Sequence, residues 1–383
     1  MQVTISVGGQ FHAFFLAEQL QKRGYLQKLI TSYPSFKISG YSIPKGKVVS
    51  LPLKEILRLG LQNIPYLGTH VNLQRCLCRL FELQASRYIE PCDIFVGWSS
   101  FSLESLRKAR SLGAITIIER GSTHIEFQRD ILKKEDDLLG IKLILPHPRI
   151  IEKELQEYQE ADYISIASNF VKRTFLEKGI PEEKLIRVPY GVDIDLFRPI
   201  SKRDNIFRII YAGGITIRKG VHYLLRAVSE LGLKNFETCL MGSIAYEIKP
   251  LLKKYSKNFR YLGRVRYKKL YRYYSYGSVF VMPSVEEGMA MVMLQAMACG
   301  LPVICTTNTG GEDIVRDGVD GFIIPIRDLK ALREKILYLY ENPSICYEMG
   351  RQARERVKNN FTWDNYGEKI IKCYEKALNE RRN

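Results

Sequence analysis

Residues 283–302 read PSVEEGMAMVMLQAMACGLP and carry the strongest signal in the chain. It follows the apolar run VFVM at 279–282, which predicts a buried strand, and it ends in Gly300 and Pro302, which stop a helix. A strand, a glycine-containing loop and an apolar helix form the repeating unit of a parallel α/β sheet. Because a helix N-terminus presents free N–H groups and a positive dipole, the loop predicts an anion site; the alternative is that 289–299 is only a core helix.

A second loop of the same kind, GGITIRKG at 213–220, lies between the strand-like run FRIIYA and a predicted helix at 220–231. Arg218 and Lys219 can neutralise a pyrophosphate there, and glycine keeps the backbone close to it. The alternative is a solvated basic turn. The loop lacks the Gly-x4-Gly-Lys-Ser/Thr spacing of a P-loop, and neither half of the chain has the G-x-G-x-x-G of a dehydrogenase.

The first half of the chain opens with the same pattern. Residues 2–7 (QVTISV) predict a strand that ends in Gly8-Gly9, and a helical pattern then runs to Gly24. Paired glycines at this point suit a phosphate or an approaching partner domain. We therefore expect two successive α/β units, with strands at 94–97, 115–118 and 163–167 in the first and at 207–212, 236–241, 279–282 and 303–305 in the second.

The stretch VPYGVD at 188–193 marks the boundary between the two units, since proline and glycine interrupt both periodic patterns. Residues 36–80 are less regular, and we interpret them only as basic and amphipathic. The stretch from Trp363 to Leu378 predicts an amphipathic helix before a charged tail.

Length and composition favour a two-domain globular protein. The chain has 383 residues, of which 46% are hydrophobic and 26% charged, so it is neither disordered nor a coiled coil. No apolar run approaches the roughly 20 residues of a membrane helix, and the N-terminus is a poor signal peptide. Eight cysteines form neither a zinc spacing nor a disulfide framework, which indicates a reducing, cytosolic compartment.

The net charge of +17 points to anionic partners: phosphorylated small molecules, anionic lipids or nucleic acid. Between Lys249 and Arg272 there are ten basic residues and no acid, with tyrosines interleaved. This run predicts contact with an anionic membrane surface, and the alternative is a solvated face of the second domain. No recognition-module signature for RNA is present, so we expect no nucleic-acid partner.

Six segments in chain order carry a family resemblance. The sequence resembles the retaining glycosyltransferases of family 4, which have the glycosyltransferase B fold. The likeness covers most of residues 160–380, and the first half matches more loosely, by Gly8-Gly9 and by ERGSTH at 119–124. The six segments are VPYGVDIDLFRP, YAGGITIRKGVHYLLRAV, FRYLGRV, MPSVEEGMAMVMLQAMACGLPVI, GGEDIVRDGVDGFIIP and FTWDNYGEKIIKCYEKAL.

The resemblance implies two Rossmann-like α/β domains that face each other across a cleft. Residues 1–190 would form the acceptor domain and residues 191–361 the nucleotide-sugar domain. A C-terminal helix at about 362–380 would pack back on the first domain.

The resemblance also implies roles for single residues. Glu287, the first Glu of the family's E-x7-E motif, would contact the donor sugar, and His124 would lie near the transferred sugar as a second catalytic candidate. The alternative for His124 is a loop histidine bonded to the backbone. His12, just after the paired glycines, is expected to face the acceptor. The donor-binding residues would be Gly8, Gly9, Gly213, Gly214, Arg218, Lys219, Arg264, Val265, Gly288, Met289, Ala290 and Gln295.

The sequence departs from the family pattern at two positions. Gln295 stands where the motif has its second Glu, and an amide offers one acceptor and one donor where a carboxylate accepts from both ribose hydroxyls. We expect ribose binding to survive with a loss of about 1 kcal/mol at most. Gly214 stands where the family usually has an Arg, and Arg218 can substitute for it.

The implied reaction moves a sugar from a nucleoside-diphosphate sugar to an acceptor hydroxyl with retention, in polysaccharide or glycolipid biosynthesis. The acceptor would be a saccharide or lipid-linked, and the enzyme would be cytoplasmic or peripheral on the inner face of the membrane. No cofactor and no metal are expected, because Asp193-Ile194-Asp195 belongs to the linker motif. The alternatives are a sugar-nucleotide epimerase on the same fold and a non-enzymatic basic protein that binds membranes or RNA.

Overall fold

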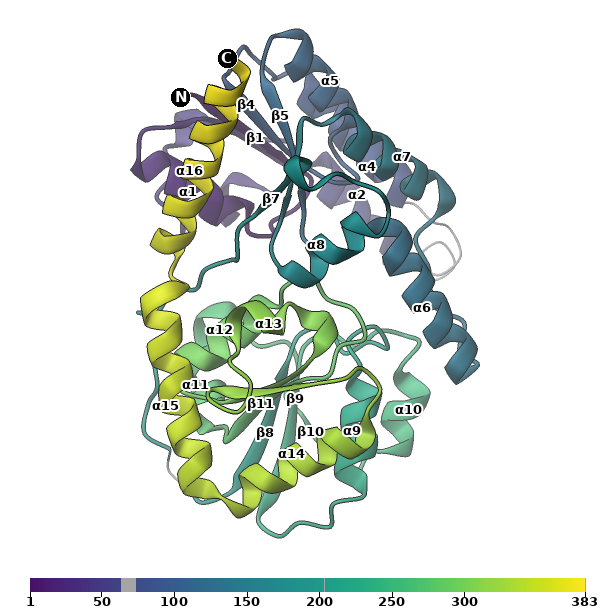
Figure 1. Cartoon of the computed structure of the whole chain (residues 1–383). Coiled ribbons are helices and arrows are strands. Elements are labelled where there is room, and N and C mark those ends of the chain that lie inside the picture. The colour runs from purple at the N-terminus through teal and green to yellow at the C-terminus, as the bar shows by residue number, and fades with distance from the viewer. Residues whose placement is uncertain (63–73, 203, 383) are drawn as a thin grey trace.

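A computed structural model describes residues 1–62, 74–202 and 204–382. The chain forms two α/β domains, one above the other in Figure 1, each with a parallel sheet between layers of helices. The expected fold class of two Rossmann-like domains is confirmed. Five strands are buried along their whole length, as expected for strands covered on both faces: Val3–Val7, Ile94–Trp98, Ile115–Arg120, Val279–Met282 and Val303–Thr306.

The first domain holds a seven-stranded sheet in the order β3-β2-β1-β4-β5-β6-β7, in which all pairs are parallel. The order reverses between β1 and β4, and ligands of such sheets bind at the carboxyl ends beside that point. The strands are β1 (Val3–Val7), β2 (Leu26–Thr31), β3 (Val48–Ser50), β4 (Ile94–Trp98), β5 (Ile115–Arg120), β6 (Tyr163–Ile166) and β7 (Leu185–Arg187). The helices are α1 (Ala13–Lys22), α2 (Leu53–Gln62), α4 (Gln74–Ser86), α5 (Leu103–Ser111), α6 (Ile125–Leu139), α7 (Pro148–Glu160) and α8 (Asn169–Leu176).

The second domain repeats this plan with a six-stranded sheet in the order β10-β9-β8-β11-β12-β13. Its strands are β8 (Phe207–Ala212), β9 (Phe236–Met241), β10 (Arg260–Tyr261), β11 (Val279–Met282), β12 (Val303–Thr306) and β13 (Gly321–Ile324). Its helices are α9 (Val221–Ser229), α10 (Lys249–Lys254), α11 (Leu270–Tyr276), α12 (Met291–Ala298), α13 (Gly311–Ile314), α14 (Leu329–Glu341) and α15 (Pro343–Asn360). Single-turn helices η1 to η5 span Ser35–Lys37, Lys45–Lys47, Glu182–Lys184, Tyr267–Lys269 and Thr307–Thr309.

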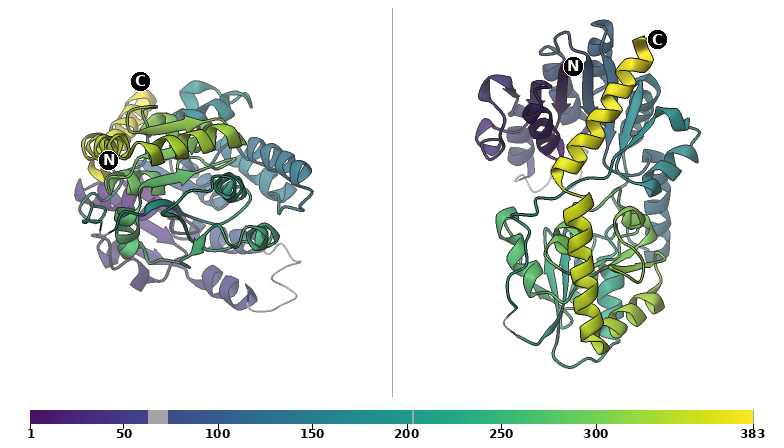
Figure 2. Two further views of the ribbon diagram at one scale, coloured as in Figure 1. Left: turned by 90° about the horizontal axis from the view of Figure 1, so that it is seen from below. Right: turned by 60° about the vertical axis from the view of Figure 1, so that its left-hand side comes forward.

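The last helix, α16 (Trp363–Arg382), returns to the first domain. The rings of Trp363 and Phe15 stack with centroids 4.1 Å apart, and Lys22 pairs with Asp364 at 2.8 Å, so α16 packs on α1. Figure 2 shows α15 and α16 running along one side of both domains. The boundary predicted at 190/191 lies in the segment between β7 and β8.

Two further features bear on function. Among the described residues, no helix is both long and apolar enough to cross a membrane. All eight cysteines are free thiols.

Candidate active site

The two loops singled out in the sequence lie together at the carboxyl ends of β8 and β11. The carbonyl oxygen of Arg218 accepts a hydrogen bond from the Val285 amide at 2.9 Å, so the two loops interlock. Gly220 has a φ of 65°, and a Cβ there would lie 1.8 Å from the Pro283 carbonyl oxygen. Only glycine allows this close approach.

Two cations and a carboxylate converge at this junction. The Lys219 ammonium forms an ion pair with the Glu287 carboxylate, and an Arg218 guanidinium nitrogen lies 4.0 Å from the same oxygen. Burial and the nearby Arg218 lower the pKa of Lys219 well below its usual value. Charge of both signs is therefore concentrated where the sequence predicts the pyrophosphate and the sugar.

The loop that begins α12 touches the first domain at Gly288. A Cβ at Gly288 would lie 2.3 Å from the carbonyl oxygen of Gly121, so the two backbones meet. The Gly288 carbonyl oxygen accepts from the Ser168 hydroxyl at 2.7 Å. Met289 and Ala290 are buried, and the Ala290 N-cap forms no side-chain bond to the helix amides. The start of α12 therefore faces the junction between the domains.

Glu286 links the two domains through its side chain, which is fully buried. It accepts from the Ser122 hydroxyl at 2.6 Å and pairs with Arg218 at 2.6 Å. Burial would raise the pKa of Glu286, but Arg218 and the hydrogen bonds outweigh burial and hold the pKa well below its usual value. Further donors to this carboxylate are the Thr123 amide and hydroxyl and the Gln128 amide.

The glycine pair after β8 lies beside Arg264 and Val265, two of the expected donor-binding residues. Gly242 has a φ of 145°, and a Cβ there would lie 1.7 Å from the Gly213 carbonyl oxygen. The Gly242 amide donates to the Gly263 carbonyl at 2.9 Å, which places exposed Arg264 and half-buried Val265 next to this edge. The Gly214 carbonyl accepts from the Tyr211 hydroxyl at 2.6 Å.

Gln295 points into the core of the second domain. Its side chain is 6% exposed, and its amide oxygen accepts from the hydroxyl of the buried Tyr274 at 3.2 Å. A ribose would have to compete with this tyrosine for the amide oxygen.

His124 is the N-cap of α6. Its Nδ1 accepts from the Glu126 amide at 3.3 Å, and its ring packs on Tyr158 and Phe175 with centroids 5.2 and 5.0 Å away. Burial and the nearby Arg120 lower the pKa of His124 to about 4. This placement matches the alternative of a histidine bonded to the backbone.

His12 lies inside the first domain rather than on its surface. It is 2% exposed, its Nε2 lies 3.3 Å from Glu119, and its ring packs on Tyr190 at 4.3 Å. Gly8 and Gly9 follow β1 directly, and a Cβ at Gly8 would collide with the Phe101 ring at 2.2 Å.

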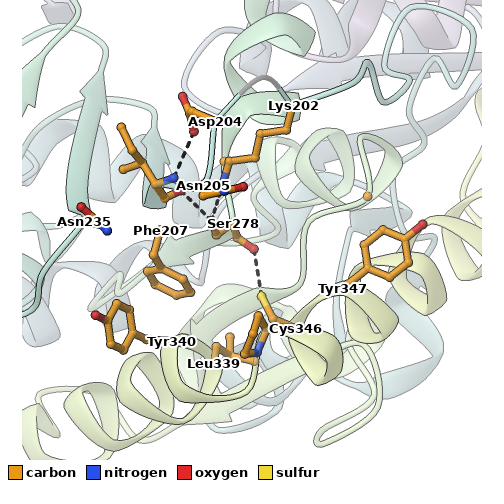
Figure 3. A pocket seen from close by; sticks show the side chains of 14 residues that line it. Lys202, Asp204, Asn205, Phe207, Asn235, Ser278, Leu339, Tyr340, Cys346 and Tyr347 are labelled. Atoms are coloured by element: carbon orange, nitrogen blue, oxygen red, sulfur yellow. Dashed lines mark hydrogen bonds between the residues drawn. The ribbon is translucent and has the colours of Figure 1, made fainter.

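A pocket of about 680 Å³ lies away from these loops, at the amino ends of the second sheet (Figure 3). Its charged side chains are already paired: Lys202 donates to the Ser278 hydroxyl at 2.9 Å, and Asp204 pairs with Arg208 at 3.1 Å. We therefore place the candidate site at the loops after β8 and β11, where Arg218 and Lys219 face the other domain.

The Asp193 side chain forms hydrogen bonds with nearby backbone amides. Its carboxylate accepts from the amides of Asp195 and Leu196 at 3.1 and 2.9 Å. Within the parts of the chain that the structure describes, no group of three or more His, Cys, Asp or Glu side chains is placed to hold a metal ion.

All ten basic residues from Lys249 to Arg272 are exposed on the second domain. Tyr261 and Tyr267 are also exposed there, whereas Tyr274 belongs to the core. The run is therefore a basic surface of the second domain, and its contact with an anionic membrane stays a prediction.

Sequence reasoning missed the residues that join the domains. Glu286 lies in the motif at 283–302, and Ser122 and Thr123 lie in the ERGSTH segment at 119–124. The sequence therefore indicated both segments but did not predict the contact between them. Gln128 carried no signal beyond its place on α6.

Residues 206–342 match the family model described as glycosyl transferases group 1. A capsular polysaccharide biosynthesis glycosyltransferase, CapM, from Staphylococcus aureus is 32% identical over 46% of this chain and 48% of its own length. A GDP-mannose-dependent monoacylated alpha-(1-6)-phosphatidylinositol monomannoside mannosyltransferase from Corynebacterium glutamicum is 25% identical over 55% of this chain and 61% of its own length. The match thus spans only about half to three fifths of these two relatives.

Solved structures show the same fold over nearly the whole chain. Sucrose-phosphate synthase from Thermosynechococcus elongatus has a TM-score of 0.73 at 18% identity and covers 99% of this chain and 100% of its own. Anabaena HepE in complex with UDP-glucose has a TM-score of 0.69 at 15% identity and covers 98% and 100%. The glycosyltransferase B fold is confirmed, and the sequence similarity to glycosyltransferases lies in the family match over residues 206–342 and in the relatives. They favour neither the epimerase nor the non-enzymatic alternative.

Proposed function

We propose that this chain transfers a sugar from a nucleoside-diphosphate sugar to an acceptor hydroxyl, with retention, in polysaccharide or glycolipid biosynthesis. The observation that carries the proposal is the convergence of Arg218, Lys219 and Glu287 beside the start of α12, against the first domain. The solved HepE complex with UDP-glucose and the GDP-mannose-dependent relative support a nucleotide-sugar donor and leave the base open.

The chemistry requires stabilisation of charge on the leaving diphosphate. Arg218, Lys219 and the amides at the start of α12 would supply it electrostatically. Lys219 would exchange its partner Glu287 for a phosphate oxygen, and this exchange would free the Glu287 carboxylate to accept hydroxyls of the donor sugar.

Retention would follow if the departing phosphate accepts the proton of the acceptor hydroxyl on the same face of the sugar. This route requires neither a metal nor a pair of carboxylates of the glycosidase kind. The His124 ring is enclosed by aromatic side chains, so we assign it no proton transfer. A location on the cytoplasmic face of a membrane stays a prediction.

A thermal-shift screen with UDP, GDP and ADP tests the proposal. A ligand at about 100 times its Kd stabilises the folded state by about 2.7 kcal/mol, so the matching diphosphate should raise Tm by several degrees. Lys219→Ala should abolish the shift, whereas Lys253→Ala on the exposed face of α10 should retain it. The proposal fails if no diphosphate shifts Tm or if both variants respond like the parent.

A further inference from the structure

Helix α2 is inverted over residues 53–60: the apolar side chains there face solvent and the first charged pair faces inward. Ile56 is 60% exposed and Leu59 is 55% exposed, whereas Lys54 and Glu55 are 7% and 8% exposed. A soluble helix normally buries its apolar stripe, so an outward stripe indicates a surface that docks on something. The large apolar side chains exposed on α2 are Leu53, Ile56, Leu57 and Leu59.

The neighbouring helix α4 extends this surface with arginines. Leu83 on α4 and Tyr88 just after it are each 44% exposed. We call residues 53–60 and 75–88 the α2–α4 face. Its acids are Glu55 and Glu82, and both are buried and paired, with Lys54 and Lys153 among their partners. Its basic residues other than Lys54 are Arg75, Arg79, Arg87 and Arg58, of which Arg58 pairs with Glu55 at 2.8 Å.

We propose that the α2–α4 face docks on an anionic lipid bilayer. The leucines and Ile56 would enter the boundary between head groups and acyl chains, and Arg75, Arg79 and Arg87 would meet lipid phosphates. A second copy of the chain fits the face less well, because a two-fold contact would set arginines against arginines.

Docking at α2 would bring the lipid close to the cleft. Lys54 donates from its ammonium to the Gly8 carbonyl at 2.6 Å and lies 5.1 Å from the centre of the Phe101 ring. The paired glycines at the carboxyl end of β1 are thus bonded directly to the docking helix. If the proposed function holds, this placement favours an acceptor that is anchored in the membrane over a free saccharide.

The face differs from the basic run at Lys249–Arg272, which the sequence singled out. The large apolar side chains exposed in that run of the second domain are Tyr261 and Tyr267 rather than aliphatic residues. A charged run without aliphatic side chains attracts a bilayer but inserts little into it.

Co-sedimentation with vesicles tests the docking face. Wild type should bind phosphatidylglycerol/phosphatidylcholine vesicles and bind pure phosphatidylcholine weakly. Ile56→Gln/Leu59→Gln should bind about tenfold less, because two aliphatic side chains that would be buried in the bilayer are lost. The matched control is Leu138→Gln/Ile144→Gln, which removes two apolar side chains that are 58% and 87% exposed elsewhere on the first domain; it should bind like wild type. Circular dichroism and Tm check that each variant is folded.

Three results would overturn the inference. In the first, wild type does not bind the anionic vesicles. In the second, both double variants bind the vesicles equally. In the third, light scattering shows a dimer that only the α2 variant dissociates, which would assign the face to a second copy of the chain. The nucleoside-diphosphate thermal shift separates this inference from the proposed function. Vesicle binding without any such shift would refute the proposed function and still support the docking face.

Discussion

Glu286 shows how one side chain connects the two domains to the charge at the site. A fully buried carboxylate is costly unless each oxygen is satisfied, and here donors from both domains satisfy it. Because Arg218 pairs with Glu286 and also donates to Ser122 at 3.3 Å, the position of the guanidinium depends on the first domain being in place. We infer that Glu286 positions Arg218 for the diphosphate.

We expect Glu286→Gln to lower kcat about 10- to 100-fold, since a charge-assisted hydrogen bond contributes about 1.5–3 kcal/mol and about 1.4 kcal/mol is tenfold in rate. Steady-state kinetics with the donor found by the screen measures the effect. Glu312→Gln is the control, because Glu312 also pairs across the domains, with Arg173, but its side chain is 33% exposed. Equal kinetic effects in the two variants would refute a positioning role for Glu286.

Helix α6 shows how a cap can resemble a catalytic residue. His124 begins the helix, and Gly140 ends it in the left-handed conformation with a φ of 61°. The cap must accept from a backbone amide, so its imidazole has to stay neutral on Nδ1. The burial that lowers the pKa of His124 to about 4 serves this purpose.

The lowered pKa has a consequence for stability. The folded pKa of about 4 lies below the unfolded value of 6.5, so the unfolded chain binds more protons between these values. Stability should therefore fall as the pH is lowered from 6.5 toward 4. His124→Asn keeps a capping oxygen and should make this slope shallower, as measured by urea denaturation at several pH values.

His147→Asn is the matched control for this experiment, because His147 caps α7 in the same way, with its Nδ1 accepting from the Arg149 amide at 3.2 Å, but is only half-buried. It should leave the slope unchanged. If His124→Asn keeps its stability but loses turnover, the catalytic hypothesis for His124 stands instead.

The molecule as a whole is held closed by contacts between the domains. Figure 1 shows α6 reaching from the first domain toward the second, where its buried Glu135 accepts from the Tyr223 hydroxyl at 3.1 Å and pairs with Arg327. Asp313 of the second domain accepts from the Asn169 amide at 2.9 Å. With the Glu286 network and the Gly288–Gly121 approach, these contacts place the start of α12 against the first domain.

Gly288→Ala should hold the domains apart, because its Cβ would lie 2.3 Å from a backbone oxygen that cannot move independently of β5. We expect a larger radius of gyration by small-angle X-ray scattering and a loss of transfer, with circular dichroism unchanged. Gly46→Ala, where a Cβ meets nothing within 4 Å, should behave like wild type. Scattering identical to wild type would show that Gly288 does not limit closure.

The repeating order of strand, glycine loop and helix is readable from the amino-acid sequence, because that order depends on local periodicity and on residues that start and stop helices. The predicted strands at 207–212, 236–241 and 279–282 agree with β8, β9 and β11. Strands β2, β3, β7, β10 and β13 were not predicted. In β2, Gln27 and Lys28 interrupt the apolar run, and the other four strands have only two to four residues, too few for a periodic pattern.

Which charged side chains meet depends on how distant segments of the chain pack together. Glu286 and Ser122 are 164 residues apart in the chain, and no local pattern encodes a contact at that separation. The same holds for the hydrogen bond that the Tyr274 hydroxyl donates to Gln295. It also holds for the inverted face of α2, where Lys54 and Glu55 face inward because Gly8 and Ser32 supply their hydrogen-bond partners. Packing of distant segments sets each of these contacts, whereas composition and spacing set only the elements that carry them.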